Sequence, residues 1–139
     1  MFENILLAID GSEHARKAAR LAGDLARHHN SNLRVVVAFE PVPAYLGEPN
    51  FQHVVFVRLR EADDVLKAAI ELVGDIPGEL KTEVLEGPPA EAILNVSDTR
   101  GNDLIVMGTR GRGRLSGLLL GSQSQKVVAH ADCPVLLIR

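Results

Sequence analysis

Residues 103–124 read DLIVMGTRGRGRLSGLLLGSQS, a short apolar run followed by a loop with unusual glycine spacing. Two residues separate Gly108 from Gly111, nine more lead to Gly121, and Ser122 follows. Glycine lets backbone N–H groups approach an anion closely, and a helix that begins near Gly121 would direct its free N–H groups and its positive dipole end to the same point. The spacing therefore predicts a phosphate-binding loop between a strand and a helix.

This loop differs from two well-known phosphate-binding loops. It is not closed by the Gly-Lys-Ser/Thr sequence that a Walker loop requires. It also lies in the last third of the chain, whereas the dinucleotide-binding Gly-x-Gly-x-x-Gly follows the first strand of its fold. We therefore expect a different kind of nucleotide site.

On both sides of the loop, apolar runs alternate with amphipathic stretches. The first runs are apolar without alternation, which is typical of strands buried on both faces of a parallel sheet. Residues 53–57 fit either an early part of the second helix or an extended segment. Strands are expected at residues 4–10, 33–39, 80–86, 103–107 and 134–138. Helices are expected at residues 12–29, after the opening residues 87–89, and from 117 or 120 to 130. A further long helix has one face marked by apolar residues from 59 to 73, and its start is left open.

Strands that alternate with helices predict a doubly wound parallel α/β sheet of five strands, because right-handed crossovers place helices on both faces. The periodicity leaves the strand order open. A length of 139 residues, 46% of them hydrophobic, predicts a single domain with its own core.

Composition restricts the partners and the compartment. A formal charge of −3 and an aromatic content of 4% argue against nucleic-acid binding, although the tract RGRGR at 110–114 would by itself suggest RNA. One cysteine cannot form an internal disulfide, and no apolar run is long enough to cross a membrane. Since no signal segment opens the sequence, we expect a cytoplasmic protein with neither membrane nor nucleic acid as a partner.

Together these features resemble the ATP-binding branch of the universal stress protein family, whose signature is Gly, two residues, Gly, nine residues, Gly, then Ser or Thr. Residues 108–122 meet each of these positions. NILLAIDGS at 4–12 looks like the opening strand and acidic turn of the family, and DCPVLLI at 132–138 looks like its closing strand. The resemblance covers essentially the whole chain. It implies the strand order 3-2-1-4-5, in which the chain reverses direction between the first and fourth strands.

This strand order places the expected site. Ligands in such sheets bind at the carboxyl ends of the strands beside the reversal, where residues 8–10 and 107–111 would converge. The resemblance implies ATP as the ligand, with Mg²⁺ or Mn²⁺. Adenine would lie against Ala8, Ile9 and Ala38, the last of which stands where the family commonly has a larger aliphatic residue. The residues expected to bind nucleotide are Ala8, Ile9, Asp10, Ala38, Met107, Gly108, Thr109, Arg110, Gly111, Arg112, Gly113, Arg114, Gly121, Ser122, Gln123 and Ser124.

Some of these side chains also have an ordinary structural explanation. Asp10 either accepts a hydrogen bond from ribose or helps to hold a divalent cation, or else its carboxylate only bonds the backbone of the Asp-Gly-Ser turn. Ser12 is expected to cap the following helix. Of the three arginines at 110, 112 and 114, Arg110 is ranked first as a phosphate ligand, and the alternative is a solvated loop.

At the start of the fourth helix, the hydroxyls of Ser122 and Ser124 are expected to donate to phosphate oxygens, and Gln123 is expected to contribute its backbone N–H. The five histidines lack paired ligand spacing, so no zinc site is expected. Cys133 is expected to be a small buried apolar group.

The resemblance implies a nucleotide-responsive regulatory module of the stress response, and the absence of a Walker lysine argues against a phosphoryl-transfer enzyme. The alternatives are a slow ATPase or a protein that phosphorylates its own Ser122 or Ser124, and a stress-response dimer that ignores nucleotide. The apolar run at 135–138 predicts a homodimer, since the implied strand order makes it a sheet edge that can pair antiparallel with its own copy. A further protein partner is expected, of a kind that the sequence does not specify.

Overall fold

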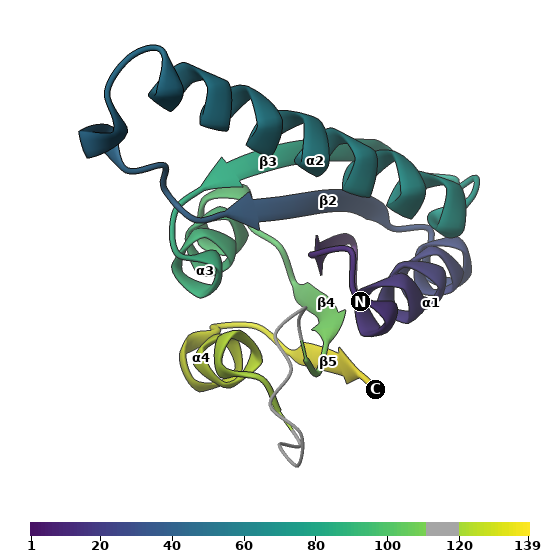
Figure 1. Ribbon diagram of the computed structural model, residues 1–139. Helices are drawn as coiled ribbons and strands as arrows, with labels where there is room; N and C mark the ends of the chain where they lie inside the picture. Colours follow the sequence, from purple (N-terminus) through teal and green to yellow (C-terminus); the bar gives the residue numbers. More distant parts are fainter. Residues whose placement is uncertain (111–119) are drawn as a thin grey trace.

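The computed structural model describes residues 1–110 and 120–139, which form one five-stranded sheet with helices on both faces (Figure 1). Neighbouring strands pair in parallel, in the order β3-β2-β1-β4-β5. The expected doubly wound α/β class and the strand order 3-2-1-4-5 are therefore confirmed. The strands are β1 (Asn4–Ile9), β2 (Asn32–Phe39), β3 (Leu80–Glu86), β4 (Leu104–Gly108) and β5 (Val135–Ile138).

The helices divide the core into two parts. Helices α1 and α2 cover one face of the sheet, and α3 and α4 cover the other (Figure 1). The larger group of buried apolar side chains lies between the sheet and the first pair of helices. The helices are α1 (Glu13–His29), α2 (Asn50–Val73), α3 (Pro89–Arg100) and α4 (Ser122–His130), and the 3₁₀ turn η1 (Ala44–Leu46) precedes α2.

The central position of β1 follows from its sequence. Successive side chains of a strand point to opposite faces, so an uninterrupted apolar run can bury both. Leu7 accordingly packs toward α1 and α2, while Leu6 packs toward α3 and α4, and both are completely buried. The edge strands β3 and β5 contain no fully covered residue.

The structure settles one helix start that the sequence leaves open and shifts another. Helix α2 begins at Asn50, so residues 53–57 are helical and the extended alternative is wrong. The cause is local, because Val54 to Val57 is an uninterrupted apolar run, in which no helical period can be recognised. Helix α4 begins at Ser122, slightly later than the expected Leu120, while the other expected start, Gly117, lies outside the described residues.

Cys133 is half-buried rather than buried, and its Sγ lies 3.7 Å from Oγ of Ser97. The expectation of a buried group is therefore wrong, although the side chain does pack against the α3 and α4 core. The reason is its position, because Cys133 precedes an edge strand that has a neighbouring strand on one side only. Among the described residues, no helix has both the length and the apolar character needed to cross a membrane.

Candidate functional site

The turn after β1 and the loop after β4 begin side by side, where the strand order reverses. Strands β1 and β4 are neighbours in parallel register, with Leu7 beside Val106. The helix that follows β1 lies on one face of the sheet, and the helix that follows β4 lies on the other. Such a divergence leaves a crevice at the carboxyl ends of the two strands, which is the usual ligand position in open α/β sheets.

A tight turn follows β1 at this edge. Asp10 Oδ1 accepts a hydrogen bond from the Ser12 backbone N–H at 2.9 Å, and Ser12 Oγ accepts one from the Ala15 N–H at 3.2 Å. Gly11 adopts φ +83°, a left-handed conformation that favours glycine. The expected helix cap at Ser12 is confirmed. One oxygen of the Asp10 carboxylate therefore serves the turn.

At the end of β4, Gly108 lies directly under α1. A Cβ on Gly108 would come within 2.7 Å of the Cβ of His14, which is closer than side chains pack. The ring Nδ1 of His14 also shares a hydrogen bond of 2.9 Å with Oγ1 of Thr109. Sequence reasoning gave His14 no role. The signal available was its position in the first turn of α1, which this strand order sets over the end of β4.

The backbone of Thr109 links the end of β4 to β5 and to the start of α4. Its N–H donates to the Ile138 carbonyl of β5 at 2.8 Å, and its carbonyl accepts from the Gly121 N–H at 2.7 Å. The second bond brings the start of α4 back to the end of β4. Gly108 and Gly121, expected to act together, are therefore held in the same part of the fold.

The backbone N–H groups in the first turn of α4 have no partner among residues 1–110 and 120–139. Its N-cap is Gly121, and no side chain of the described residues caps it. The first N–H groups of a helix have no partner within the helix, so those of Ser122, Gln123 and Ser124 are available to an anion. Ser122 is exposed to solvent. This end of α4 therefore combines free donors with the positive end of a helix dipole.

Two side chains of the same turn hold α4 in place. Ser124 is 3% exposed, and its Oγ donates to the Gly108 carbonyl at 2.9 Å. Gln123 Oε1 accepts a hydrogen bond of 2.9 Å from the Ala90 N–H in the first turn of α3. The only hydroxyl proton of Ser124 is thus used within the protein, which leaves its backbone N–H as the group that can face a ligand.

The remaining expected residues are mostly part of the core or lie outside the described chain. Ala8 and Met107 are buried toward α3 and α4, while Ile9 is buried toward α1 and α2. Ala38 is half-buried near the end of β2, and Arg110 is exposed. Gly111, Arg112, Gly113 and Arg114 lie outside the described residues.

No group of three or more His, Cys, Asp or Glu side chains is arranged to hold a metal ion within the described ranges. Asp10 offers a carboxylate at the end of β1, next to the first turn of α1. Mg²⁺ is commonly held by one or two carboxylates together with substrate phosphates and water. The residues present therefore fit a cation that arrives with a nucleotide, rather than a protein-built metal site.

Comparison with known proteins finds relatives along the whole chain. The profile of the universal stress protein family matches residues 1–139. The universal stress protein in QAH/OAS sulfhydrylase 3'region of Thermus aquaticus is 54% identical over 139 residues, covering 100% of both chains. Universal stress protein UspA from Lactobacillus plantarum has a TM-score of 0.87 at 28% identity, over 99% of this chain and 98% of that chain. The universal stress protein from Archaeoglobus fulgidus, solved in complex with dAMP, shares the fold with a TM-score of 0.72 at 21% identity, over 100% of both chains.

Proposed function

This chain belongs to the universal stress protein family, and from that membership we propose that it is an ATP-binding regulatory module of the stress response. One observation carries the proposal. The first turn of α4, with no side-chain cap among the described residues, is held at the carboxyl end of β4 by the Gly121 to Thr109 hydrogen bond. Free N–H groups at a helix start are a binding site for phosphate.

In the proposed complex, phosphate oxygens accept hydrogen bonds from the N–H groups of residues 122–124 and from the exposed Ser122 hydroxyl. Adenine lies against the ends of β1 and β2, near Ala8, Ile9 and Ala38. Because the side chains of Ala8 and Ile9 are buried, their contacts with the base are made mainly by the backbone. The second oxygen of Asp10 accepts from ribose or holds Mg²⁺ or Mn²⁺ beside the phosphates. Arg110, which is exposed, adds charge to the phosphate end.

The nucleotide acts here as a signal. Binding engages the first turn of α4, and the hydrogen bonds from Gly121 to Thr109 and from Thr109 to Ile138 link that turn to β5. The dAMP complex of the Archaeoglobus fulgidus protein supports an adenine nucleotide as the class of ligand. A second candidate, self-phosphorylation, is favoured at one residue only, because Ser122 is exposed whereas the Ser124 hydroxyl is buried and bonded to Gly108.

The proposal includes a homodimer through β5. Strand β5 is at the edge of the sheet, and all four of its residues, Val135–Ile138, are only half-buried. Antiparallel pairing with a second copy across a two-fold axis would satisfy the open backbone groups and cover these side chains. The proposed compartment is the cytoplasm, with a further protein partner that responds to the nucleotide state.

The proposal is tested by mass spectrometry of the natively purified protein, followed by calorimetry with ATP in the presence and absence of Mg²⁺. We expect a co-purifying adenine nucleotide, and ATP binding with one nucleotide per chain. Phosphate release that continues far beyond one per chain would favour the slow ATPase instead. Absence of binding for ATP, ADP, AMP and cyclic AMP alike would favour the nucleotide-independent dimer and overturn the proposal.

A further inference from the structure

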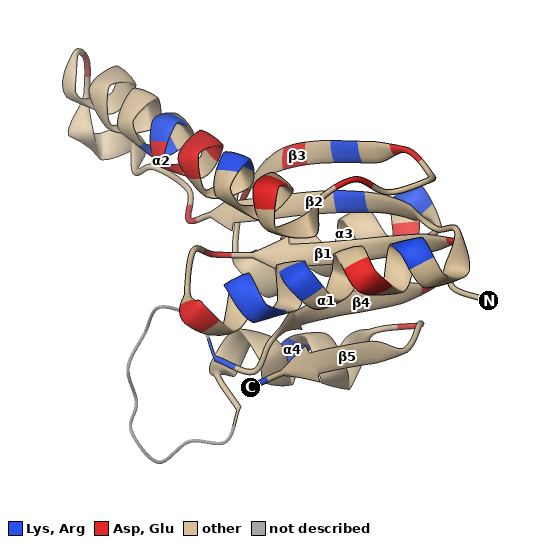
Figure 2. Ribbon diagram, turned by 90° about the vertical axis from the view of Figure 1, so that its right-hand side faces the viewer, with Lys and Arg blue, Asp and Glu red and all other residues tan. Residues whose placement is uncertain are grey.

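Helix α2 projects past the end of the sheet that it covers (Figures 1 and 2). Its buried residues, Ala62, Leu66, Ala69 and Val73, all lie in its second half. Residues 50–61 include no buried position, and 49–57 carry no Asp, Glu, Lys or Arg. Phe56 and Leu59 are 58% and 45% exposed. The first two turns of α2, residues 50–57, therefore carry no charge and have few of the described residues packed against them.

A second stripe runs along the whole helix beside the buried one. Its members are separated by three and four residues in strict alternation, which is the spacing of a coiled-coil seam. Each of them is half-buried or exposed. The stripe consists of Phe51, Val54, Arg58, Glu61, Val65, Ala68 and Leu72.

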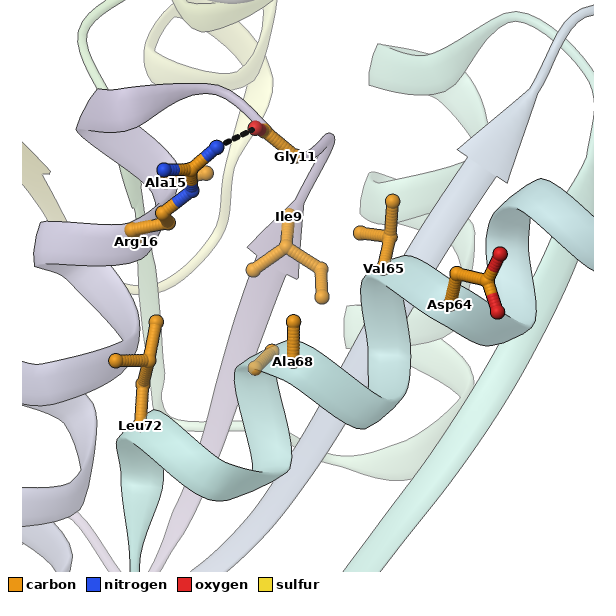
Figure 3. A pocket seen from close by; sticks show the side chains of 9 residues that line it. Ile9, Gly11, Ala15, Arg16, Asp64, Val65, Ala68 and Leu72 are labelled. Atoms are coloured by element: carbon orange, nitrogen blue, oxygen red, sulfur yellow. Dashed lines mark hydrogen bonds between the residues drawn. The ribbon is translucent and has the colours of Figure 1, made fainter.

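The second half of this stripe lines a hollow between α2 and α1. Val65, Ala68 and Leu72 project from α2 into a pocket of about 200 Å³ whose floor includes Ile9 (Figure 3). Small side chains on both helices leave this space open, among them Ala15 of α1. Phe51 and Val54, at one end of the stripe, therefore form an apolar projection. Val65, Ala68 and Leu72, at the other end, line an apolar groove.

The stripe is complementary to itself in the antiparallel direction. Antiparallel helices in a coiled coil place each a position opposite a d position of the partner. When Val54 is set opposite the partner's Val65, Phe51 falls opposite the partner's Ala68. In the same register Arg58 falls opposite the partner's Glu61, so the two charged positions of the stripe meet as opposite charges. Neither of these charged side chains makes an ion pair in the described part of the chain.

We propose that a second copy of this chain docks on this surface, with the two α2 helices antiparallel and the projection of each seated over the groove of the other. Both halves of the contact are present on one chain, as an isologous two-fold interface requires. The projection carries no charge, and at its base Arg58 and Glu61 face the opposite charges of the second copy. The surface is separate from the β5 edge, because α2 packs over β2 and β3, which lie toward the opposite edge of the sheet. The contact does not depend on nucleotide.

Disulfide cross-linking tests the register directly. In a Cys133→Ser background, Val54→Cys combined with Val65→Cys is expected to give a covalent dimer on mild oxidation. The two positions are separated by about 16 Å along one helix, too far for a disulfide within a chain. The matched control is Phe56→Cys combined with Lys67→Cys, which has the same separation on another side of α2 and is expected to remain uncross-linked. A Val54/Val65 variant that stays monomeric on a non-reducing gel, or cross-links no better than the control, overturns the proposal.

Charge reversal tests the central pair in the same cross-linking background. Arg58→Glu and Glu61→Arg each place like charges opposite one another, so each is expected to slow cross-linking more than about tenfold. The double reversal restores opposite charges and is expected to recover the wild-type rate. Circular dichroism confirms that each variant remains folded. Single reversals that leave the rate unchanged, or a double reversal no faster than either single, contradict this contact.

Discussion

Gly108 and His14 are in contact across the point where β4 meets α1, and the contact is possible only because residue 108 has no side chain. A Cβ at Gly108 would lie 2.7 Å from the His14 Cβ, and 3.1 and 3.2 Å from backbone atoms of His14 and Ala15. The first glycine of the loop motif therefore has a packing role in addition to its proposed place in the phosphate site. It fixes how closely the end of β4 and the turn after β1 approach each other.

Gly108→Ala is accordingly expected to destabilise the fold, even though alanine is small. Backbone atoms are among the atoms that a Cβ would meet, so a change of side-chain rotamer cannot relieve the overlap. We expect the free energy of unfolding, measured with urea, to fall by about 1–3 kcal/mol. Val128→Ala, at an exposed site on α4, is the control and should change it by less than about 0.5 kcal/mol. A Gly108→Ala protein as stable as the wild type would contradict the close contact.

The two roles of Asp10 can be separated with two variants. Asp10→Asn keeps a side-chain oxygen that can accept from the Ser12 N–H, whereas Asp10→Ala removes it. Asp10→Ala should lower both stability and ATP affinity. Asp10→Asn should keep the stability but lose the effect of Mg²⁺ on ATP affinity. Calorimetry with ATP and dATP, with and without Mg²⁺, measures these quantities. If Asp10→Ala changes neither affinity, nor the preference for ribose, nor the dependence on Mg²⁺, the residue serves the turn alone.

The β5 dimer can be tested at a residue that faces the open edge. The Pro134 carbonyl accepts from Ile105 of β4, and the Ile138 carbonyl accepts from Thr109 directly after β4. Because backbone groups alternate along a strand, those of Leu137 point away from β4. Leu137→Pro thus removes an edge N–H without removing a bond to β4. We expect a folded monomer by light scattering and circular dichroism. Leu136→Pro, whose N–H has the opposite orientation, should instead damage the fold. A folded Leu137→Pro protein with an intact β5 contact, or a wild-type monomer at micromolar concentration, would count against this interface.

Most helices and strands of the fold can be predicted from the sequence because their signals are local. The uninterrupted apolar run of β1 and the cap at Ser12 are visible without tertiary information, and each is found as expected. The sequence leaves the start of α2 open, because the apolar run Val54 to Val57 fits a helix and an extended segment equally well. The strand order is implied by the family resemblance, because the same hydrophobic periodicity along the chain fits several strand orders.

Residues of the candidate site were harder to assign, because their roles depend on contacts between distant parts of the chain. His14 and Thr109 are 95 positions apart in sequence and share a hydrogen bond. The position of Ser124 in the first turn of a helix predicts a hydroxyl that donates to phosphate. In the structure this hydroxyl donates instead to the carbonyl of Gly108. A glycine spacing indicates where a ligand is expected. It does not show which hydroxyl is already engaged within the protein.

Calorimetry of ATP binding to Gly121→Val shows whether ATP binds at the first turn of α4. Valine at the N-cap sets a branched side chain beside the free N–H groups of residues 122–124. Ala129→Val adds the same side chain at an exposed site near the other end of α4 and is the matched control. Wild type and Ala129→Val are expected to bind ATP equally, and folded Gly121→Val is expected to bind at least about tenfold more weakly. Unchanged ATP affinity in a folded Gly121→Val protein would contradict the assignment of the site.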